Sequence, residues 1–205
     1  MNISHGAVVM NSTSRFIYVH DPMCSWCWGH RPVWQLLEAE LSTMVRVEYR
    51  VGGLAPDSDE PMPQEQQEAI SGYWQKIHDL LGVPFNFDFW HLNKPRRSTF
   101  PACRAVIAAR WQHAELAMIH AIQEAYYLRA MNPSDLSTLV TLAMELELDV
   151  EKFQQDIQSE ALNEAFIDEL TFARQLPIAG FPSMVLLNNK PIYEIELDYK
   201  DYRGA

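Results

Sequence analysis

The sequence is poor in cysteine, in basic residues and in long apolar runs, and each shortage argues against a class of protein. Three cysteines in 205 residues are too few for a scaffold held together by disulfides. Lys and Arg total 16 against 27 Asp and Glu, giving a formal net charge of -11, which disfavours nucleic acid as a partner. No run of 18 apolar residues occurs, so we expect no membrane span and no membrane partner.

The amino-terminal segment also lacks the features of a secretory signal. Residues 1–15 (MNISHGAVVMNSTSR) have neither a basic start nor a long apolar stretch, so we expect a cytoplasmic protein. Thiols stay reduced there, which favours catalytic or metal-binding roles for a cysteine pair over a structural disulfide. Hydrophobic residues make up 48% of the chain, enough for a sizeable core in one domain, or in one domain with an insertion.

The first part of the chain predicts a βαβ unit. Residues 15–20 (RFIYVH) and 45–53 (VRVEYRVGG) have the β-branched and alternating patterns of strands. Residues 27–41 between them have helical periodicity, with Pro32 inside the helix as an expected kink. A strand, a helix and a strand within about 40 residues indicate a right-handed parallel unit.

A proline-rich hinge at residues 56–63 (PDSDEPMP) separates this unit from a long helical region. Helices are predicted over 64–81 (closed by Gly82), from Ser98 or Thr99 up to a break at Asn132-Pro133, after a cap at Ser134, over 150–158 and over 161–176. Residues 83–97 are aromatic-rich and are expected to be irregular. Strand patterns at 183–188 and 191–197 flank Asn189-Lys190 and indicate a β-hairpin.

Cys24 and Cys27 form a Cys-x-x-Cys pair between the first strand and the following helix. Cys24 would face the helix N-terminus, where unpaired N–H groups stabilise a thiolate, and Cys27 would be more buried. An exposed thiolate that attacks a disulfide and a second thiol that resolves the product suit thiol–disulfide exchange. Two other interpretations stay open. One is a zinc site, although no second pair or His cluster lies near Cys103; the other is two packed thiols without chemistry.

The chain resembles the thioredoxin fold, and within it the DsbA family. The resemblance is carried by the CSWC motif, the helix kinked at Pro32, the long helical block and a late x-Pro before the hairpin. The segments DPMCSWCWG, STFPACRA and GFPSMV are most similar to the FrnE-like disulfide oxidoreductases. The resemblance implies an α/β, thioredoxin-like fold with a large inserted all-helical domain. Residues 1–60 and 160–205 would form the two halves of the thioredoxin-like domain, and residues 61–159 the insertion. Only DYKDYRGA follows the hairpin, so the family's last helix has no counterpart.

The resemblance also assigns roles by position. It implies that Cys24 is the attacking cysteine, that Cys27 is the resolving one, and that Pro182 is the cis-proline of the family. The substrate contacts would be made by Ser25, Trp26, Phe181 and Pro182. Trp26 is expected to be exposed. No His stands between the cysteines, so we expect a less oxidising couple than in a strongly oxidising relative.

Two further residues are candidate accessory groups. Asp21 precedes the pair, where it would tune Cys27 or shuttle its proton, or simply shape the turn. His20 is open to the same interpretations. Cys103 would be a third redox thiol, or a small core residue.

The predicted function is therefore that of a protein disulfide oxidoreductase or isomerase acting on thiol- or disulfide-bearing proteins or small thiols. No metal or bound organic cofactor is required for this chemistry, and glutathione stays open as a co-substrate. One alternative is a glutathione-dependent transferase or isomerase of the kappa or chromene-carboxylate isomerase type, which typically has serine where Cys24 stands. The other is a non-catalytic peptide-binding or chaperone module. The oligomeric state does not follow from the sequence.

Overall fold

A single four-stranded sheet organises the protein, seen in a computed structural model that describes residues 14–188 and 192–204. Its strands are β1 (Arg15–His20), β2 (Arg46–Val51), β3 (Ser183–Leu187) and β4 (Ile192–Ile195), in the order β2-β1-β3-β4. β1 runs parallel to β2, as the βαβ pattern predicts, and antiparallel to β3. β3 and β4 form the predicted hairpin; its Asn189-Lys190 turn lies outside the described residues.

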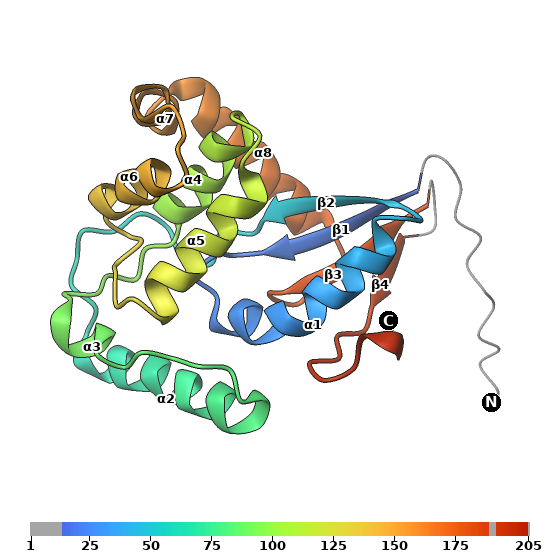
Figure 1. The fold of residues 1–205 in the computed structure, drawn as a ribbon, viewed down its shortest axis with the longest axis horizontal. Coiled ribbons are helices and arrows are strands. Elements are labelled where there is room, and N and C mark those ends of the chain that lie inside the picture. The colour runs from blue at the N-terminus through green and yellow to red at the C-terminus, as the bar shows by residue number, and fades with distance from the viewer. Residues whose placement is uncertain (1–13, 189–191, 205) are drawn as a thin grey trace.

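Two helices lie on opposite faces of the sheet (Figure 1), and the alternating side chains of β1 pack in the cores on both faces. Phe16 and Tyr18 share a core with Trp34 of α1 (Ser25–Leu41). Ile17, on the other face, packs in a second core with Ala173 of α8 (Glu160–Gln175). Because both faces are covered, β1 is buried along nearly its whole length. The cysteine pair follows the buried end of β1 and is itself buried.

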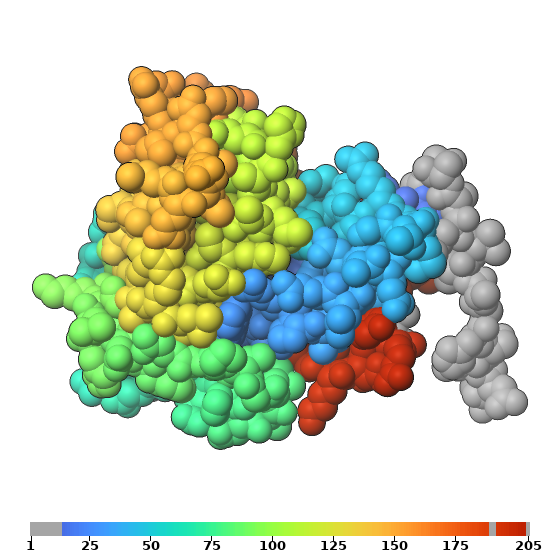
Figure 2. All heavy atoms as spheres, viewed as in Figure 1, coloured from blue at the N-terminus to red at the C-terminus, as the bar shows by residue number. Residues whose placement is uncertain are grey.

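Between β2 and α8 the described secondary structure is helical apart from one isolated bridge. The helices are α2 (Gln64–Leu81), α3 (Phe89–Leu92), α4 (Phe100–Arg110), α5 (Glu115–Tyr127), α6 (Leu136–Glu145) and α7 (Val150–Ile157). Gly82 closes α2 with φ 71°, as predicted. In the space-filling view these helices cover one side of the molecule, and α1 emerges between them and the C-terminal segment (Figure 2).

Three details of the helical region differ from the sequence prediction. Residues 98–131 contain two helices, because the chain turns at His113 with φ 62°. The aromatic loop contains the one-turn helix α3. Ser134 does not cap α6, whose N-cap is Asp135; the Ser134 hydroxyl instead donates to the carbonyl oxygen of Ser98 at 2.6 Å. None of the helices in the described part of the chain has the length and apolar content needed to cross a bilayer.

The segment after β4 folds back along α1. The Tyr199 ring lies 5.3 Å from the Trp26 ring and 5.2 Å from the His30 ring, edge-on to both. The Tyr202 hydroxyl donates to Glu40 at 2.9 Å. Tyr199 is therefore part of the surroundings of the CSWC motif.

Candidate active site

The cysteine pair lies where β1 passes into α1. Cys24 is the N-cap of α1 in an extended conformation (φ -81°, ψ 118°), and its carbonyl accepts the first helical hydrogen bond, from Trp28 N–H at 3.1 Å. Cys27 lies one turn further on, so both side chains lie on the same face of the helix. Both are free thiols. Burial and the hydrogen bond with Cys24 raise the pKa of Cys27 well above its usual value.

The predicted exposure of this motif is only partly correct. Cys27 is the more buried thiol, as expected, at 1% exposure. Cys24 is itself buried, at 6% exposure, so the expectation of an exposed attacking thiolate is wrong. The loop before β3 covers Cys24: the Cys24 Sγ donates a hydrogen bond to the carbonyl oxygen of Phe181 in this loop, at 3.4 Å. Trp26, expected to be exposed, is half-buried under Tyr199, and Ser25 is half-buried too.

The loop before β3 lies beside the pair because β3 hydrogen bonds to β1. The Phe181–Pro182 peptide bond is cis, as the resemblance implies. The Phe181 ring lies on the backbone of Gly52, where an added Cβ would come within 2.1 Å of the ring. The Phe181 ring would therefore have to move to admit any side chain at position 52.

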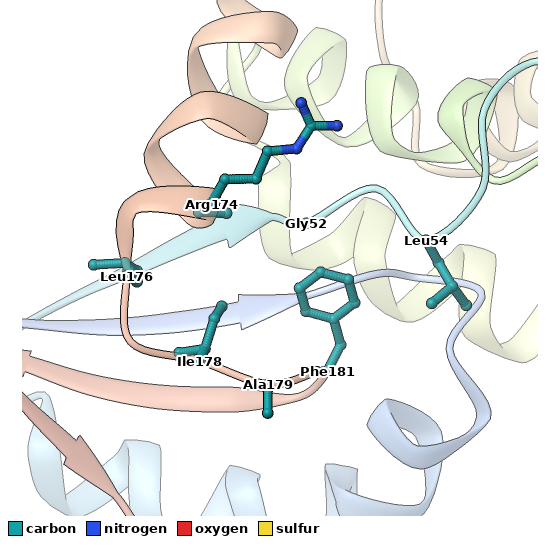
Figure 3. Close-up of a pocket in the computed structure, with 9 residues that line it drawn as sticks. Gly52, Leu54, Arg174, Leu176, Ile178, Ala179 and Phe181 are labelled. Carbon is teal, nitrogen blue, oxygen red and sulfur yellow. The ribbon is translucent and has the colours of Figure 1, made fainter.

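A pocket of about 420 Å³ adjoins this loop on the side away from α1. Figure 3 shows the Phe181 ring between Ile178 and Leu54, with Arg174 above it. The lining is mainly apolar, and Arg174 supplies its charge. Neither cysteine lines the pocket, but Phe181 joins it to the thiol of Cys24.

Asp21 brings several distant segments together beside the pair. Its buried carboxylate accepts hydrogen bonds from Met23 N–H (2.8 Å), Leu54 N–H (2.7 Å) and the Thr99 hydroxyl (2.6 Å), and from the Cys103 thiol at 3.5 Å. Burial raises the pKa of Asp21, while these hydrogen bonds act in the opposite direction. The two candidate accessory residues, Asp21 and Cys103, are thus in contact.

Cys103 has the environment of a core residue. It is fully buried, and burial followed by the neighbouring Asp21 raises the pKa of its thiol well above the usual value. A thiol without access to solvent and with a raised pKa is a poor nucleophile.

A cluster of buried polar side chains on the α1 side of β1 was largely missed by the sequence analysis. The Tyr18 hydroxyl lies 3.1 Å from His30 Nδ1. Burial, with a smaller effect of Arg110, lowers the pKa of His20 to about 3. Burial lowers the pKa of His30 to about 4. The available signal was the alternation of RFIYVH, which places Tyr18 and His20 on the same core face as Phe16.

An ion-pair network holds the end of β2 beside the site. Glu169 of α8 accepts a hydrogen bond from Val51 N–H at 2.9 Å. The same carboxylate pairs with Arg110, and with Arg50 at 3.5 Å. Because Val51 directly precedes Gly52, this network fixes the backbone against which Phe181 packs. No grouping of three or more His, Cys, Asp or Glu side chains suited to a metal occurs among residues 14–188 and 192–204.

A Cys-x-x-Cys pair at a helix N-terminus, beside a cis-proline on a sheet of this order, defines a thioredoxin-like fold. The family model described as thioredoxin matches residues 16–203, and the chain belongs to that family. The helical region between β2 and α8 makes the fold DsbA-like, and structures of DsbA oxidoreductases share it.

Two solved structures are similar over most of the chain. One, from Nitrosomonas europaea, carries a provisional assignment as a protein disulfide isomerase; it is 28% identical, with a TM-score of 0.83 and 93% of both chains covered. The other is the cytosolic disulfide reductase DsbM from Pseudomonas aeruginosa, 25% identical with a TM-score of 0.75 and 89% of both chains covered. DsbM has also been solved with glutathione.

Curated relatives have a different description. The ClpXP adapter protein SpxH from Halalkalibacterium halodurans is 25% identical over 175 residues, which is 82% of this chain and 57% of that protein. The SpxH of Bacillus subtilis is 21% identical over 173 residues, again 57% of its length. The chain thus spans little more than half the length of the curated relatives it matches.

Proposed function

We propose that this protein is a thiol–disulfide oxidoreductase in which Cys24 is the nucleophile and Cys27 the resolving thiol. The observation that carries the proposal is the position of Cys24. It caps α1, hydrogen bonds to Cys27, and contacts the carbonyl oxygen of Phe181 beside the cis peptide bond of Pro182. The DsbA-like fold and the similarity to a disulfide reductase support the same chemistry.

The exchange has two steps. The Cys24 thiolate attacks one sulfur of a substrate disulfide; the substrate S–S bond breaks, and one substrate thiolate leaves. Cys27 then loses its proton and attacks Cys24 Sγ, which forms the Cys24–Cys27 disulfide and releases the second substrate thiolate. The same steps in reverse oxidise a dithiol substrate. The N–H groups and the dipole at the start of α1 stabilise the negative charge on Cys24 when it leaves or attacks.

The substrate is proposed to bind across the half-buried Ser25 and Trp26 and the loop at Phe181 and Pro182. Because Cys24 is buried beside the Phe181 carbonyl, we propose that this loop moves away from Cys24 when a substrate sulfur reaches it. The apolar pocket beside Phe181 is suited to a side chain next to the substrate cysteine. Such a docking mode favours protein substrates with an extended, partly apolar segment around the disulfide.

The wider setting is proposed from the relatives. We propose a cytoplasmic location, supported by the cytosolic reductase DsbM, and glutathione as a co-substrate, supported by the DsbM structure with glutathione. Residues 61–159 are proposed as the inserted helical domain. We also propose that the protein belongs to the FrnE-like subfamily.

The first experiment is the reduction potential of the Cys24–Cys27 couple. Protein with Cys103→Ala is equilibrated in glutathione buffers, so that only one pair can form, and the fraction of disulfide is read by mass spectrometry. We expect a reversible couple between roughly -120 and -270 mV. Cys27→Ala in the same background is the matched control and should stop at the mixed disulfide with glutathione. A wild-type pair that never forms the disulfide across the buffer range would refute the oxidoreductase proposal.

The curated relatives favour a second candidate, an adapter that presents a protein to a protease. An adapter acts by binding, so Cys24→Ser should preserve its activity, whereas it abolishes disulfide exchange. Degradation of a client protein by ClpXP with wild-type or Cys24→Ser protein separates the two candidates.

A further inference from the structure

The pocket beside Phe181 contains one basic side chain, Arg174, and its described lining includes no acidic one. Nine of the eleven arginines in the chain form an ion pair with a carboxylate. Arg174 forms none within residues 14–188 and 192–204. The pocket therefore combines an apolar wall with a positive charge that no carboxylate of the described chain neutralises.

The loop before β3 adds backbone donors to the same pocket. Ala179 and Gly180 are both exposed and both line it. Their N–H groups donate to no backbone acceptor in the part of the chain that the structure describes. The space at Gly180 is open, because an added Cβ there would meet nothing within 4 Å. A ligand in the pocket thus meets hydrogen-bond donors on the loop as well as the guanidinium group.

The pocket lies within reach of a substrate cysteine that approaches Cys24. Phe181 connects the two places, since its carbonyl oxygen is 3.4 Å from Cys24 Sγ and the residue also lines the pocket. In an extended segment, side chains two positions apart point to the same side and are separated by about 7 Å. A substrate whose cysteine meets Cys24 can therefore place the side chain two positions away in the pocket.

We propose that Arg174 selects protein substrates with a glutamate two positions from the reactive cysteine. The inference rests on the proposed function, since it names the substrate class of that site. The aliphatic part of the glutamate packs against Ile178 and Phe181, and its carboxylate accepts hydrogen bonds from the planar guanidinium group. Figure 3 shows the Arg174 guanidinium on one side of the pocket and the apolar side chains of Ile178, Phe181 and Leu54 on the other.

Other occupants match the pocket less well. A lysine would be repelled by Arg174 and would find no carboxylate in the described lining. A purely apolar side chain would cover the guanidinium group without offering it an acceptor, which costs free energy. The chain as a whole has a net charge of -11 and repels acidic substrates, so a preference for glutamate has to arise from a local cation.

The test compares peptides that differ only in the charge of one side chain. Short peptides with blocked ends and a single cysteine are oxidised to symmetric dimers. They carry glutamate, glutamine or lysine two positions before the cysteine or, in a second series, two positions after it. Protein with Cys27→Ala and Cys103→Ala traps the mixed disulfide at Cys24, and its rate of formation is measured by acid quenching and mass spectrometry.

We expect the trapping protein to react with the glutamate peptide about 5-fold faster than with the glutamine peptide in at least one series, the upper range for an exposed ion pair. Arg174→Gln should abolish this preference, Arg174→Glu should reverse it in favour of lysine, and Arg174→Lys should retain part of it. Lys76→Gln is the matched control, because it removes the same charge from an exposed position on α2, and it should keep the preference.

The outcomes separate this inference from the proposed function. Equal rates with glutamate and glutamine peptides in both series, or a preference that persists in Arg174→Gln, would overturn the inference while leaving disulfide exchange intact. A trapping protein that forms no mixed disulfide with any peptide would overturn the proposed function instead. Arg174 is exposed near the end of α8, so we expect its variants to fold.

A last arm uses oxidised glutathione with free or esterified glycine carboxylates. If Arg174→Gln changes the rate ratio of these two compounds but not that of the peptides, the carboxylate recognised is that of glutathione, and the inference of a glutamate-bearing protein substrate is wrong. A peptide preference that depends on Arg174 supports the inference.

Discussion

Mild acid should destabilise this protein, because two of its histidines are buried in the uncharged form. His20 and His30 are each 1% exposed, and their pKa values are lowered from 6.5 to about 3 and about 4. Between these values and 6.5 the unfolded chain binds protons that the folded chain does not. The stability that the neutral histidines contribute is therefore present above pH 6.5 and is lost as the pH falls towards the folded pKa values.

The size of the effect follows from 1.36 kcal/mol per pKa unit. At pH 5 each histidine lies about 1.5 units below the unfolded value, so each costs about 2 kcal/mol and the two together about 4 kcal/mol. A typical domain has only about 5–15 kcal/mol in total. Asp21 acts in the opposite direction, since its raised pKa means that the folded state binds its proton more tightly. Its contribution grows in acid and offsets part of the loss.

Urea unfolding at pH 7, 6 and 5 measures this loss directly. The slope of stability against pH near pH 5 should approach about 2.7 kcal/mol per unit, the value for two protons. His30→Gln should reduce the slope by about half, whereas the exposed His91→Gln should leave it unchanged. A slope in His30→Gln equal to that of the wild-type protein would show that His30 is not buried neutral, and would refute this account of the core beside Cys27, because the contribution of Asp21 is the same in both proteins.

Two further predictions concern the surroundings of Cys24. Gly52→Ala places a Cβ within 2.1 Å of the Phe181 ring, so it should cost about 1–3 kcal/mol in urea unfolding and slow exchange. Gly72→Ala, which meets nothing within 4 Å inside α2, should instead stabilise by up to about 1 kcal/mol. Thr99→Val removes the 2.6 Å hydrogen bond to Asp21 and should cost about 1–3 kcal/mol, largely restored by Thr99→Ser; equal stability of Thr99→Val and wild type would contradict this role.

The parts of the fold that the sequence predicts well are those with a local pattern. The strand at residues 15–20 and the helix at 64–81 have the predicted bounds, because alternation and a closing glycine are local signals. The turn at His113 is not predicted, because an exposed histidine with φ 62° has no turn signature in the sequence. Backbone hydrogen bonds close this turn, among them the one from Ala114 N–H to the carbonyl oxygen of Ala109 at 2.9 Å. Residue type predicts Ser134 as a cap, but its hydroxyl donates to the carbonyl oxygen of Ser98, which is distant in sequence.

The candidate site divides in the same way. The CSWC motif and the late proline are visible in the sequence, and the resemblance implies their roles. The burial of Cys24 depends on Phe181, which is 157 positions away along the chain, so no local pattern reports it. The contact of Asp21 with Thr99 and Cys103 also arises only when the helical region packs against the sheet. Such contacts follow from tertiary structure and have no periodicity to read.

The carboxylate of Asp21 has a consequence for how the sequence can change over evolutionary time. It binds donors from the motif loop, from the loop after β2 and from the start of α4. A mutation of Asp21 alone removes the acceptor of all four hydrogen bonds. A mutation of Thr99 alone removes one of the four donors to the buried Asp21 carboxylate. Homologous sequences should therefore keep positions 21 and 99 together or exchange them together, so that the pair is inherited as one unit.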